Sequence, residues 1–578
     1  MQRRVSTPIV SSLGLLLLIA AVAPAAERGL VGHWKLNGDA QDHSGGNRHA
    51  TNHNVNAQLG EFNGINGYLQ VPNSSELNFG TGDFSIALQI STQEQLDDVL
   101  GDLVSKFDPV TRKGFVLTVK SNTSAYNGPC NTRPLCFATD SGTTGQWADC
   151  GRPGGKTNCS DALTVFNGEL YVGIVDAPDE AEWAHVYRYK GGKDWEDCGR
   201  VGDGKVKGVY AMIVHEGELY AATAGSHGGP TANIGDYVRV YRYLGGTKWE
   251  DLGQPGENYR ANSLASFKGK LYVCAIHTGG KNGGVYVYEG NQSWNLTENS
   301  PGRVHCLTVH DGKLYGAYPR GEVFEYDNDA WKSLGNPYVT QKECNQLHTM
   351  GVYQGELYVG TWPFGKVSIW RGGKWVDVGR MGDSTEIVGL VTYNGSFYAG
   401  SIPRAEVFRY DGPQHWTSLR KLFDPPTYDA VKDIEDWSRA SSLTVFQDKM
   451  FVSTATCFRA MISKPQPDEI RGKVYSFKAG EGVSYDRDIG PGSKHIAAVR
   501  AGDTMKLYVD GQLVATQKGA KQLDVSNDVP LSIGFGPQSY FAGKMHDVRL
   551  YNRALSSEEA MGLAKASPVS VGAPKPAK

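Results

Sequence analysis

Several patterns that mark familiar protein classes are missing from this sequence of 578 residues. Neither charge is in excess, with 58 Lys and Arg against 61 Asp and Glu, and neither gathers into long blocks. Binding to a nucleic-acid backbone depends on concentrated basic charge, so nucleic acid is not an expected partner. No apolar run after residue 26 approaches the ~20 residues of a membrane-spanning helix, so we expect no membrane span in the mature chain.

The short motifs of common enzymes are also missing. The sequence has no G-x-S-x-G, no H-E-x-x-H, no P-loop and no G-x-G-x-x-G after a strand. These are the spacings that position a nucleophile, a zinc ion or a phosphate. No Cys and His residues have zinc-site spacing. We therefore expect a protein without catalytic activity, although residues remote in the sequence can still meet in one folded site.

Cysteine is scarce, and its odd count of nine leaves at least one thiol unpaired or intermolecular. Cys274 and Cys306 lie inside apolar runs, which predicts buried thiols. Loop disulfides are predicted where cysteines lie among Gly, Pro and Asn, at Cys130, Cys136, Cys150 and Cys159.

The N-terminus has the pattern of a signal peptide. Arg3 and Arg4 precede an apolar run over residues 9–22, and small residues follow at 23–25. The run is short for a membrane span, so residues 1–25 are predicted to be cleaved on export to the periplasm, the cell surface or the medium. An uncleaved membrane anchor is the alternative.

A repeated segment organises the middle of the chain. Each copy has an apolar run, a turn and a strand of the type Gly-x-Leu-Tyr, as in residues 166–173, 215–222 and 353–360. The aromatic residue of each copy serves here as its marker, and neighbouring markers are 40 to 53 residues apart: Tyr171, Tyr220, Tyr272, Tyr315, Tyr358, Tyr398 and Phe451. This period is typical of a four-stranded propeller blade, so we predict a β-propeller of seven blades, with eight as the alternative.

A second hairpin lies between the markers, with a Gly-Gly turn followed by Trp, as in residues 186–199 and 240–253. Its Trp residues are predicted to pack between neighbouring blades: Trp195, Trp249, Trp294, Trp331, Trp375 and Trp416. The repeat resembles kelch-type propellers, but its Gly pair occupies a different place, so no function is carried over from that family. A hairpin-like segment at 135–151 is predicted to complete the last blade and close the ring.

The two ends of the chain differ from the repeat and share one pattern. The first contains W-x-L, D-x-S-G and F-x-G-x-x-x-Y motifs at residues 34–71, and the second contains L-Y-V-D-G at 507–511 and D-V-R-x-Y-x-R-A-L-S at 547–556. Together they resemble the laminin-G-like, concanavalin A-type jelly roll. Neither half closes a sandwich alone, because each leaves strand edges uncovered.

The resulting prediction is an all-β chain in which a propeller interrupts a laminin-G-like jelly-roll sandwich. Residues 27–120 and 481–565 form the two halves of the sandwich, residues 121–480 form the inserted propeller, and residues 566–578 form a disordered tail. Locally, Gly511 is expected to take a positive φ in a turn after Asp510, and Ser556 with Glu559 is expected to form a capping box at a helix start.

The family resemblance also implies a Ca²⁺ ion held near Asp39, Asp42 and Asn63. Calcium takes six to eight oxygen ligands, so backbone and water would have to supply most of them. The Asp that the family places after Phe62 is Asn63 here, which lowers the negative charge of this site.

Ligand-binding candidates lie where the predicted inner strands begin and in the loops that follow the second strands. The first group is Asp161, Arg260, His305, Asn345, Gln346, His348, Glu386 and Arg439, and the second is Arg320, Trp362 and Arg404. His, Arg, Asn and Trp on one face suit hydrogen bonding to a sugar ring, stacking on it, or capture of a carboxylate. The same residues could instead satisfy backbone groups around a water-filled channel.

Three functions remain open at this stage. The leading hypothesis is an exported, non-catalytic recognition protein for a glycan or another extracytoplasmic protein. The alternatives are an enzyme acting on polysaccharides or sugar acids, and an architectural component of the cell envelope. A dense convergence of His, Arg and carboxylate groups at one propeller mouth would favour the enzyme, and a shallow aromatic groove would favour glycan binding.

Overall fold

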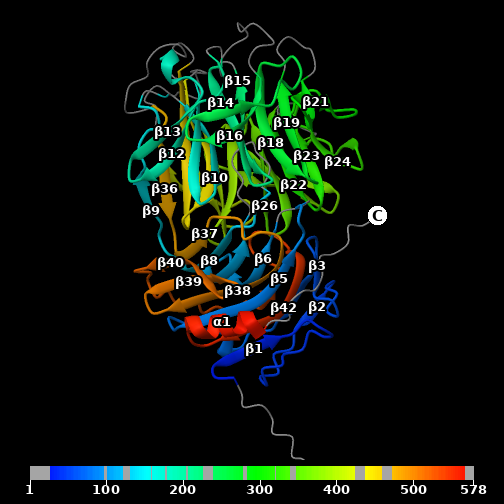
Figure 1. The fold of residues 1–578 in the computed structure, drawn as a ribbon, viewed down its shortest axis with the longest axis vertical. Coiled ribbons are helices and arrows are strands. Elements are labelled where there is room, and N and C mark those ends of the chain that lie inside the picture. Colours follow the sequence, from blue (N-terminus) through cyan, green and yellow to red (C-terminus); the bar gives the residue numbers. More distant parts are fainter. Residues whose placement is uncertain are drawn as a thin grey trace, which may run out of the picture.

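The computed structural model describes residues 27–96, 100–120, 131–155, 157, 159–175, 179–203, 206–224, 238–276, 283–318, 320–338, 346–423, 436–458 and 471–566. Figure 1 shows an elongated molecule with a sandwich at one end and a propeller at the other. The predicted signal peptide, most of the predicted tail, Cys130 and Asn345 lie outside the described residues. No helix among the described residues is long and apolar enough to cross a membrane.

Both ends of the chain contribute strands to the two sheets of the sandwich. One sheet has the order β1 (Leu30–Trp34), β42 (Ala542–Tyr551), β5 (Phe84–Thr92), β38 (Gly492–Ala501), β39 (Thr504–Val509) and β40 (Gln512–Lys518), with β3 (Glu61–Asn63) also beside β42. The other has the order β2 (Thr51–His53), β4 (Tyr68–Val71), β41 (Leu531–Ile533), β6 (Asp102–Asp108), β7 (Lys113–Val119), β8 (Leu135–Ser141) and β37 (Glu481–Tyr485). Both neighbours of β5 come from the part of the chain after the propeller.

The core of the sandwich follows from the alternation of residues along its strands. In β5 the large apolar residues, such as Phe84, occupy every second position, which places them on one face of the sheet. The ring of Phe84 lies 5.0 Å from that of Phe115 on β7 and 5.5 Å from that of Phe137 on β8. The core therefore joins strands from both sheets, and the propeller interrupts the sandwich sequence without interrupting its core.

Strand β8 lies in the sandwich, which differs from the predicted boundary at residue 120. It pairs with β7 on one side and β37 on the other. Only the second part of the segment 135–151 joins the propeller, where β9 (Gln146–Asp149) pairs with β36 (Val474–Lys478) and completes the last unit as predicted. Two alternating strands around a Gly turn are as typical of a propeller blade as of a sandwich. The sequence pattern alone therefore did not assign β8 to the sandwich.

The propeller strands described here pair into seven four-stranded antiparallel units. In chain order the units are β10 (Cys159–Phe166), β11 (Glu169–Val175), β12 (His185–Gly191), β13 (Asp194–Arg200); β14 (Gly208–His215), β15 (Glu218–Ala224), β16 (Val240–Gly245), β17 (Lys248–Asp251); β18 (Arg260–Phe267), β19 (Lys270–Ile276), β20 (Gly284–Gly290), β21 (Ser293–Leu296); β22 (Cys306–His310), β23 (Lys313–Ala317), β24 (Val323–Asp327), β25 (Ala330–Ser333); β26 (Gln346–Tyr353), β27 (Glu356–Trp362), β28 (Lys366–Arg371), β29 (Lys374–Arg380); β30 (Glu386–Tyr393), β31 (Ser396–Ile402), β32 (Glu406–Tyr410), β33 (Trp416–Lys421); and β34 (Asp436–Phe446), β35 (Lys449–Phe458), β36, β9. The first strand of each unit contacts the first strand of the next, and β34 contacts β10, so the units form a closed ring.

Indole hydrogen bonds join neighbouring units around this ring. Trp195 donates its Nε1–H to the carbonyl of Cys150, at 2.8 Å, and so links the first unit to the strand that completes the last one. Five further indoles donate to the preceding unit at 2.8 to 3.1 Å, four of them to a backbone carbonyl and Trp331 to the hydroxyl of Thr297: Trp249, Trp294, Trp331, Trp375 and Trp416. The prediction that these residues pack between blades is confirmed.

One face of the propeller rests on the sandwich. The turns after the inner strands make the contacts: Gly168 N–H donates to the carbonyl of Asp486 at 3.0 Å, and Gln354 N–H donates to that of Pro537 at 2.7 Å. Lys120 and Asp486 form an ion pair in this junction, with both side chains 5% exposed. Because the inner strands end at the sandwich, they begin at the opposite mouth of the propeller.

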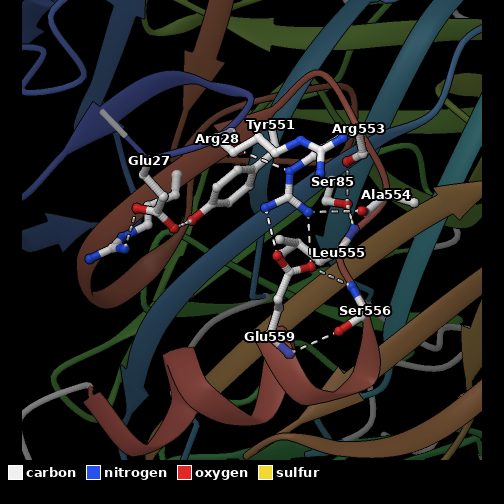
Figure 2. A network of polar contacts seen from close by, with 10 residues as sticks. Glu27, Arg28, Ser85, Tyr551, Arg553, Ala554, Leu555, Ser556 and Glu559 are labelled. Atoms are coloured by element: carbon white, nitrogen blue, oxygen red, sulfur yellow. Dashed lines mark hydrogen bonds and ion pairs between the residues drawn. The ribbon is translucent and has the colours of Figure 1, made fainter. Parts of the chain in front are cut away.

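Helix α1 (Ser557–Ala566) has the predicted capping box, which Figure 2 shows. Glu559 N–H donates to Ser556 Oγ at 3.2 Å, and Ser556 N–H donates to Glu559 Oε2 at 2.8 Å. Arg553 binds both carboxylate oxygens of Glu559, each at 2.8 Å. Gly511 has a φ of +76°, also as predicted, in a turn where Asp510 takes a φ of +50°.

Five cysteines are free thiols: Cys136, Cys150, Cys198, Cys274 and Cys306. The thiols of Cys130 and Cys159, for which loop disulfides were also predicted, lie outside the described part of the chain. Cys274 and Cys306 are buried inside strands as predicted. The prediction of loop disulfides is wrong for Cys136 and Cys150, which are free and buried, Cys136 within β8 and Cys150 directly after β9. Pro134 directly precedes β8, and Gly151 follows Cys150 after β9. The ends of strands therefore have the same local composition as a loop held by a disulfide.

Candidate functional site

The candidate site lies at the propeller mouth that faces away from the sandwich. Its residues have a fixed distance in sequence from the aromatic markers. The residues ten positions before the markers occupy the same place in every unit. We call these seven residues the inner ring: Asp161, Tyr210, Asn262, His305, His348, Val388 and Ser441. The residues twelve positions before the markers lie nearer the mouth, and we call those of the last six units the rim: Gly208, Arg260, Arg303, Gln346, Glu386 and Arg439.

A β-bulge accompanies the inner-ring position in six of the seven units. The pairing register shifts between Ser160 and Ala162, for example, which leaves Asp161 as the extra residue, and equivalent shifts occur in β14, β18, β26, β30 and β34. In β22 the equivalent position is His305, just before the strand begins. A bulge turns a side chain out of the regular alternation, and bulges are common beside functional sites.

Seven predicted candidates lie at this mouth, and four of them form one contiguous group. His348 Nδ1 lies 3.0 Å from Glu386 Oε1, and the ring of His305 lies 4.6 Å from that of His348 in an edge-to-face arrangement. His348 Nε2 lies 2.8 Å from Gln346 Oε1. The guanidinium of Arg260 lies 5.5 Å from the ring centre of Tyr210, and that of Arg439 lies 4.5 Å from the ring centre of Trp437.

The charges at the mouth act on each other. Burial alone raises the pKa of Glu386, but His348, and after it Arg439 and Arg260, outweigh burial and hold this pKa below its usual value. Burial, with the nearby His348, Arg260, Arg303 and Arg439, lowers the pKa of His305 well below its ordinary value. Glu386 is therefore a carboxylate and His305 a neutral imidazole near pH 7.

The remaining predicted ligand residues lie elsewhere. Because the second strand of each unit runs back from the sandwich, the loops after it lie on the same face as the mouth but farther from the axis. Arg404 forms an ion pair there with Asp383 at 2.9 Å, and Arg320 is exposed. Trp362, at the end of β27, is half-buried beside its register partner Gln346. Asn345 lies outside the described residues.

The three predicted calcium ligands use their oxygens within the chain. Asp42 is buried and accepts N–H bonds from His33, Ser44 and Arg48 at 2.9 to 3.0 Å. Asn63 Oδ1 accepts three backbone N–H bonds from its own turn. Asp39 Oδ1 accepts the Gln41 N–H and contacts His43. Asp42 and Asn63 therefore support turns through their oxygens, and calcium binding near these residues stays a prediction.

A separate cavity of about 550 Å³ lies between the sandwich and the propeller. Amide side chains such as Asn54 and Gln95 line it, together with a Glu61–Lys544 ion pair of 3.1 Å and the turn at Asp311. Its charged groups on the sandwich side are paired with each other. Among the described residues that line it on that side, no unpaired charge distinguishes it as a site for an ionic ligand, unlike the propeller mouth.

Sequence reasoning missed part of the mouth. Arg303, Tyr210, Asn262 and Ser441 were not among the candidates, although each has the same spacing from its marker as a residue that was. The signal was present as that constant offset. A single polar residue near a strand start does not show this offset, which appears only when the units are aligned on their markers.

Comparison with known proteins finds a family model that matches part of the chain. A family model described as the Concanavalin A-like lectin/glucanases superfamily matches residues 437–561, from the last propeller unit through the second half of the sandwich. The second half of the sandwich is therefore similar to members of that superfamily.

Similar solved structures include one titled "YCF48 bound to D1 peptide", 12% identical, with 59% of this chain and 96% of that chain covered at a TM-score of 0.38. Another is the WD40 beta propeller domain of Doa1, 10% identical, with 57% and 96% covered and a TM-score of 0.38. No curated protein matches the chain.

Proposed function

We propose that this chain is an exported recognition protein whose propeller mouth binds a carboxylate group of an extracytoplasmic glycan or protein. The supporting observation is the composition of the rim, where three of the six residues are arginines and one is a carboxylate. Arg260, Arg303 and Arg439 all act on His305, while the rim holds a single carboxylate, Glu386, which is engaged with His348. Guanidinium groups bind carboxylates through paired N–H donors, and such bonds are stronger in a partly buried site than in water.

The sandwich supports binding as the purpose of the chain. The family model that matches its second half is described as the Concanavalin A-like lectin/glucanases superfamily, whose name includes carbohydrate-binding proteins. The propeller lies at the other end of the molecule from the sandwich (Figure 1). The signal-peptide pattern of residues 1–25 supports a ligand outside the cytoplasm.

The test is equilibrium binding of two carboxylate probes, oligogalacturonate and poly-glutamate peptide, to the full chain. We expect at least one probe to bind, and Arg260→Gln and Arg439→Gln to weaken it by about tenfold or more, equivalent to about 1.4 kcal/mol. Arg320→Gln is the matched control, because Arg320 is an exposed arginine of the same propeller and should leave the affinity unchanged. Unaltered affinity in both rim variants, or no binding of either probe, would overturn the proposal.

A sugar-acid-active enzyme is the second candidate, and one observation favours it. His305, His348, Glu386 and the arginines converge at one mouth, the arrangement that we expected of an enzyme. A carboxylate that orients an imidazole is also a common acid–base pair. Incubation with oligogalacturonate and analysis of the products distinguishes the candidates: turnover that Glu386→Gln abolishes supports an enzyme, and an unchanged oligosaccharide that remains bound supports recognition.

A further inference from the structure

We propose that the inner ring is a hydroxyl-binding subsite behind the rim, so that the preferred ligand is a sugar acid, with hydroxyl groups on the same ring as its carboxylate. This inference rests on the proposed carboxylate binding at the rim and names the ligand class. It assigns a role to Asp161, His305 and Ser441, which the rim does not use.

Asp161 and His305 of the inner ring are buried without hydrogen-bond partners in the described part of the chain. Asp161 is 1% exposed, and neither of its carboxylate oxygens has a hydrogen bond there. His305 is 3% exposed, and the same holds for both of its ring nitrogens. Buried polar atoms are almost always hydrogen-bonded, because burial without a partner is costly. Groups that the protein leaves unsatisfied at a channel mouth are therefore suited to a ligand or to water.

These unsatisfied groups occupy equivalent positions in their propeller units. Asp161 is the bulge residue of β10, and Ser441 is the bulge residue of β34, the neighbouring strand across the ring closure. Ser441 Oγ is likewise buried without a partner among the described residues. His305 and His348 occupy the same position in neighbouring units, and their rings touch. The side chains of this position thus face a shared space.

The chemistry of the subsite matches hydroxyl groups. The carboxylate of Asp161 only accepts hydrogen bonds, a neutral His305 donates one and accepts one, and the Ser441 hydroxyl does both. A sugar hydroxyl can donate to Asp161 and accept from His305. A second carboxylate would be repelled by Asp161, and a cationic ligand would have to pass the rim arginines.

The spacing of rim and ring also suits a single sugar. Rim and inner-ring residues are two positions apart along each strand, which corresponds to about 7 Å of extended chain. One pyranose ring spans a carboxylate and its distal hydroxyls over a comparable length. The rim can therefore hold the carboxylate while the inner ring contacts the hydroxyls of the same residue.

The test compares three probes by calorimetry with the full chain: galacturonate, galactose, and cyclohexanecarboxylate, which has the carboxylate but no hydroxyl. We expect galacturonate to bind about tenfold or more tightly than either of the others, because a site built to bind hydroxyls discriminates against a ligand that lacks them. Asp161→Asn and Ser441→Ala should reduce the preference for galacturonate over cyclohexanecarboxylate. Asp383→Asn, a matched carboxylate variant that lies on the same propeller face and pairs with Arg404, should keep it.

The outcomes separate this inference from the proposed function. If galacturonate and cyclohexanecarboxylate bind equally and Arg439→Gln weakens both, the rim binds carboxylates and the hydroxyl subsite is wrong. If only poly-glutamate binds and rim variants weaken it, the sugar-acid assignment is again wrong while the rim function stands. If neither sugar acid nor peptide binds the wild-type chain, both proposals fail. Circular dichroism of each variant shows whether a loss of affinity reflects a loss of fold, and Ser441→Ala retains the test if Asp161→Asn does not fold.

Discussion

His348 Nδ1 lies 3.0 Å from Glu386 Oε1, so side chains from two neighbouring propeller units form one polar pair at the mouth. His348 belongs to the inner ring and Glu386 to the rim, and the pair therefore connects the two layers of the site. Arg260 and Arg439 come from two further units and both lower the pKa of Glu386. A binding site that draws on several units in this way depends on the closed ring.

Replacing Glu386 with Gln should make stability less dependent on acid pH. The folded-state pKa of Glu386 lies below its usual value, so the wild type gains stability from this group above about pH 4 and loses it as the pH falls through the folded pKa. We expect Glu386→Gln to destabilise the chain by about 3 kcal/mol at pH 7 and by less at pH 3. Urea unfolding at both pH values measures this, with exposed Glu216→Gln as the control. An equal loss at both pH values would contradict the ion-pair account.

Replacing Asp102 with Asn should have the opposite pH dependence. Burial at the junction raises the pKa of Asp102 to about 7, although its Oδ2 accepts N–H bonds from Gln538 and Ser539. The folded chain therefore holds a proton that the unfolded chain releases above about pH 4, and stability falls between pH 4 and 7.

At pH 8 the buried negative charge of Asp102 lowers the free energy of unfolding by up to about 4 kcal/mol. Asp102→Asn should remove this loss, because the amide keeps an acceptor oxygen and carries no charge. Asp448, whose pKa is also raised to about 7 by burial, provides a second variant of the same kind. Thermal unfolding from pH 5 to pH 8 measures both. A wild-type chain more stable at pH 8 than at pH 5, with Asp102→Asn unchanged relative to it, would show that Asp102 is not protonated in the folded state.

Replacing Trp195 with Phe should weaken ring closure. The indole of Trp195 bonds the first unit to Cys150, beside the strand that completes the last unit. Loss of a single hydrogen bond of this kind costs about 1 kcal/mol, and the smaller ring adds a packing loss. Trp249→Phe removes the same bond between two units that are consecutive in the chain and is the matched comparison. Both variants should lower the free energy of unfolding, and no change in either would show that these bonds do not stabilise the ring.

Replacing Ser556 with Ala should destabilise the sandwich modestly. The variant loses the Oγ acceptor of the capping box, for which losses of about 1 kcal/mol are typical. Denaturant unfolding measures the change, and Lys565→Ala, an exposed position in the last turn of the same helix, is the control. A Ser556→Ala chain as stable as wild type would mean that the Arg553–Glu559 contacts alone hold the helix start.

Much of this fold could be predicted from the sequence, because the patterns that indicate it are either repeated along the chain or formed by residues close together in sequence. A fixed spacing recurs at each aromatic marker, and the Trp of the outer hairpin recurs with it, so the units and their contacts were predictable. The capping box depends on residues only three positions apart, such as Ser556 and Glu559. The meeting of His305, His348 and Glu386 followed from strand starts converging on a ring axis.

The rest depended on information that no single segment contains. Strand β8 alternates like a blade strand, and only its pairing with β7 and β37 assigns it to the sandwich. The bulge at Asp161 is visible only in the register of β10 against β11. Asp42 resembles a calcium ligand in sequence, but its oxygens are already bonded to backbone N–H groups that the chain brings around it.

A crystal structure of the full chain soaked with galacturonate tests the central claim most directly. The account predicts the sugar at the propeller mouth, with its carboxylate on the guanidinium groups of Arg260 or Arg439 and its hydroxyls toward Asp161 and His305. Galacturonate bound only elsewhere, for example in the cavity beside Glu61 and Lys544, with the mouth occupied by water alone, would contradict it.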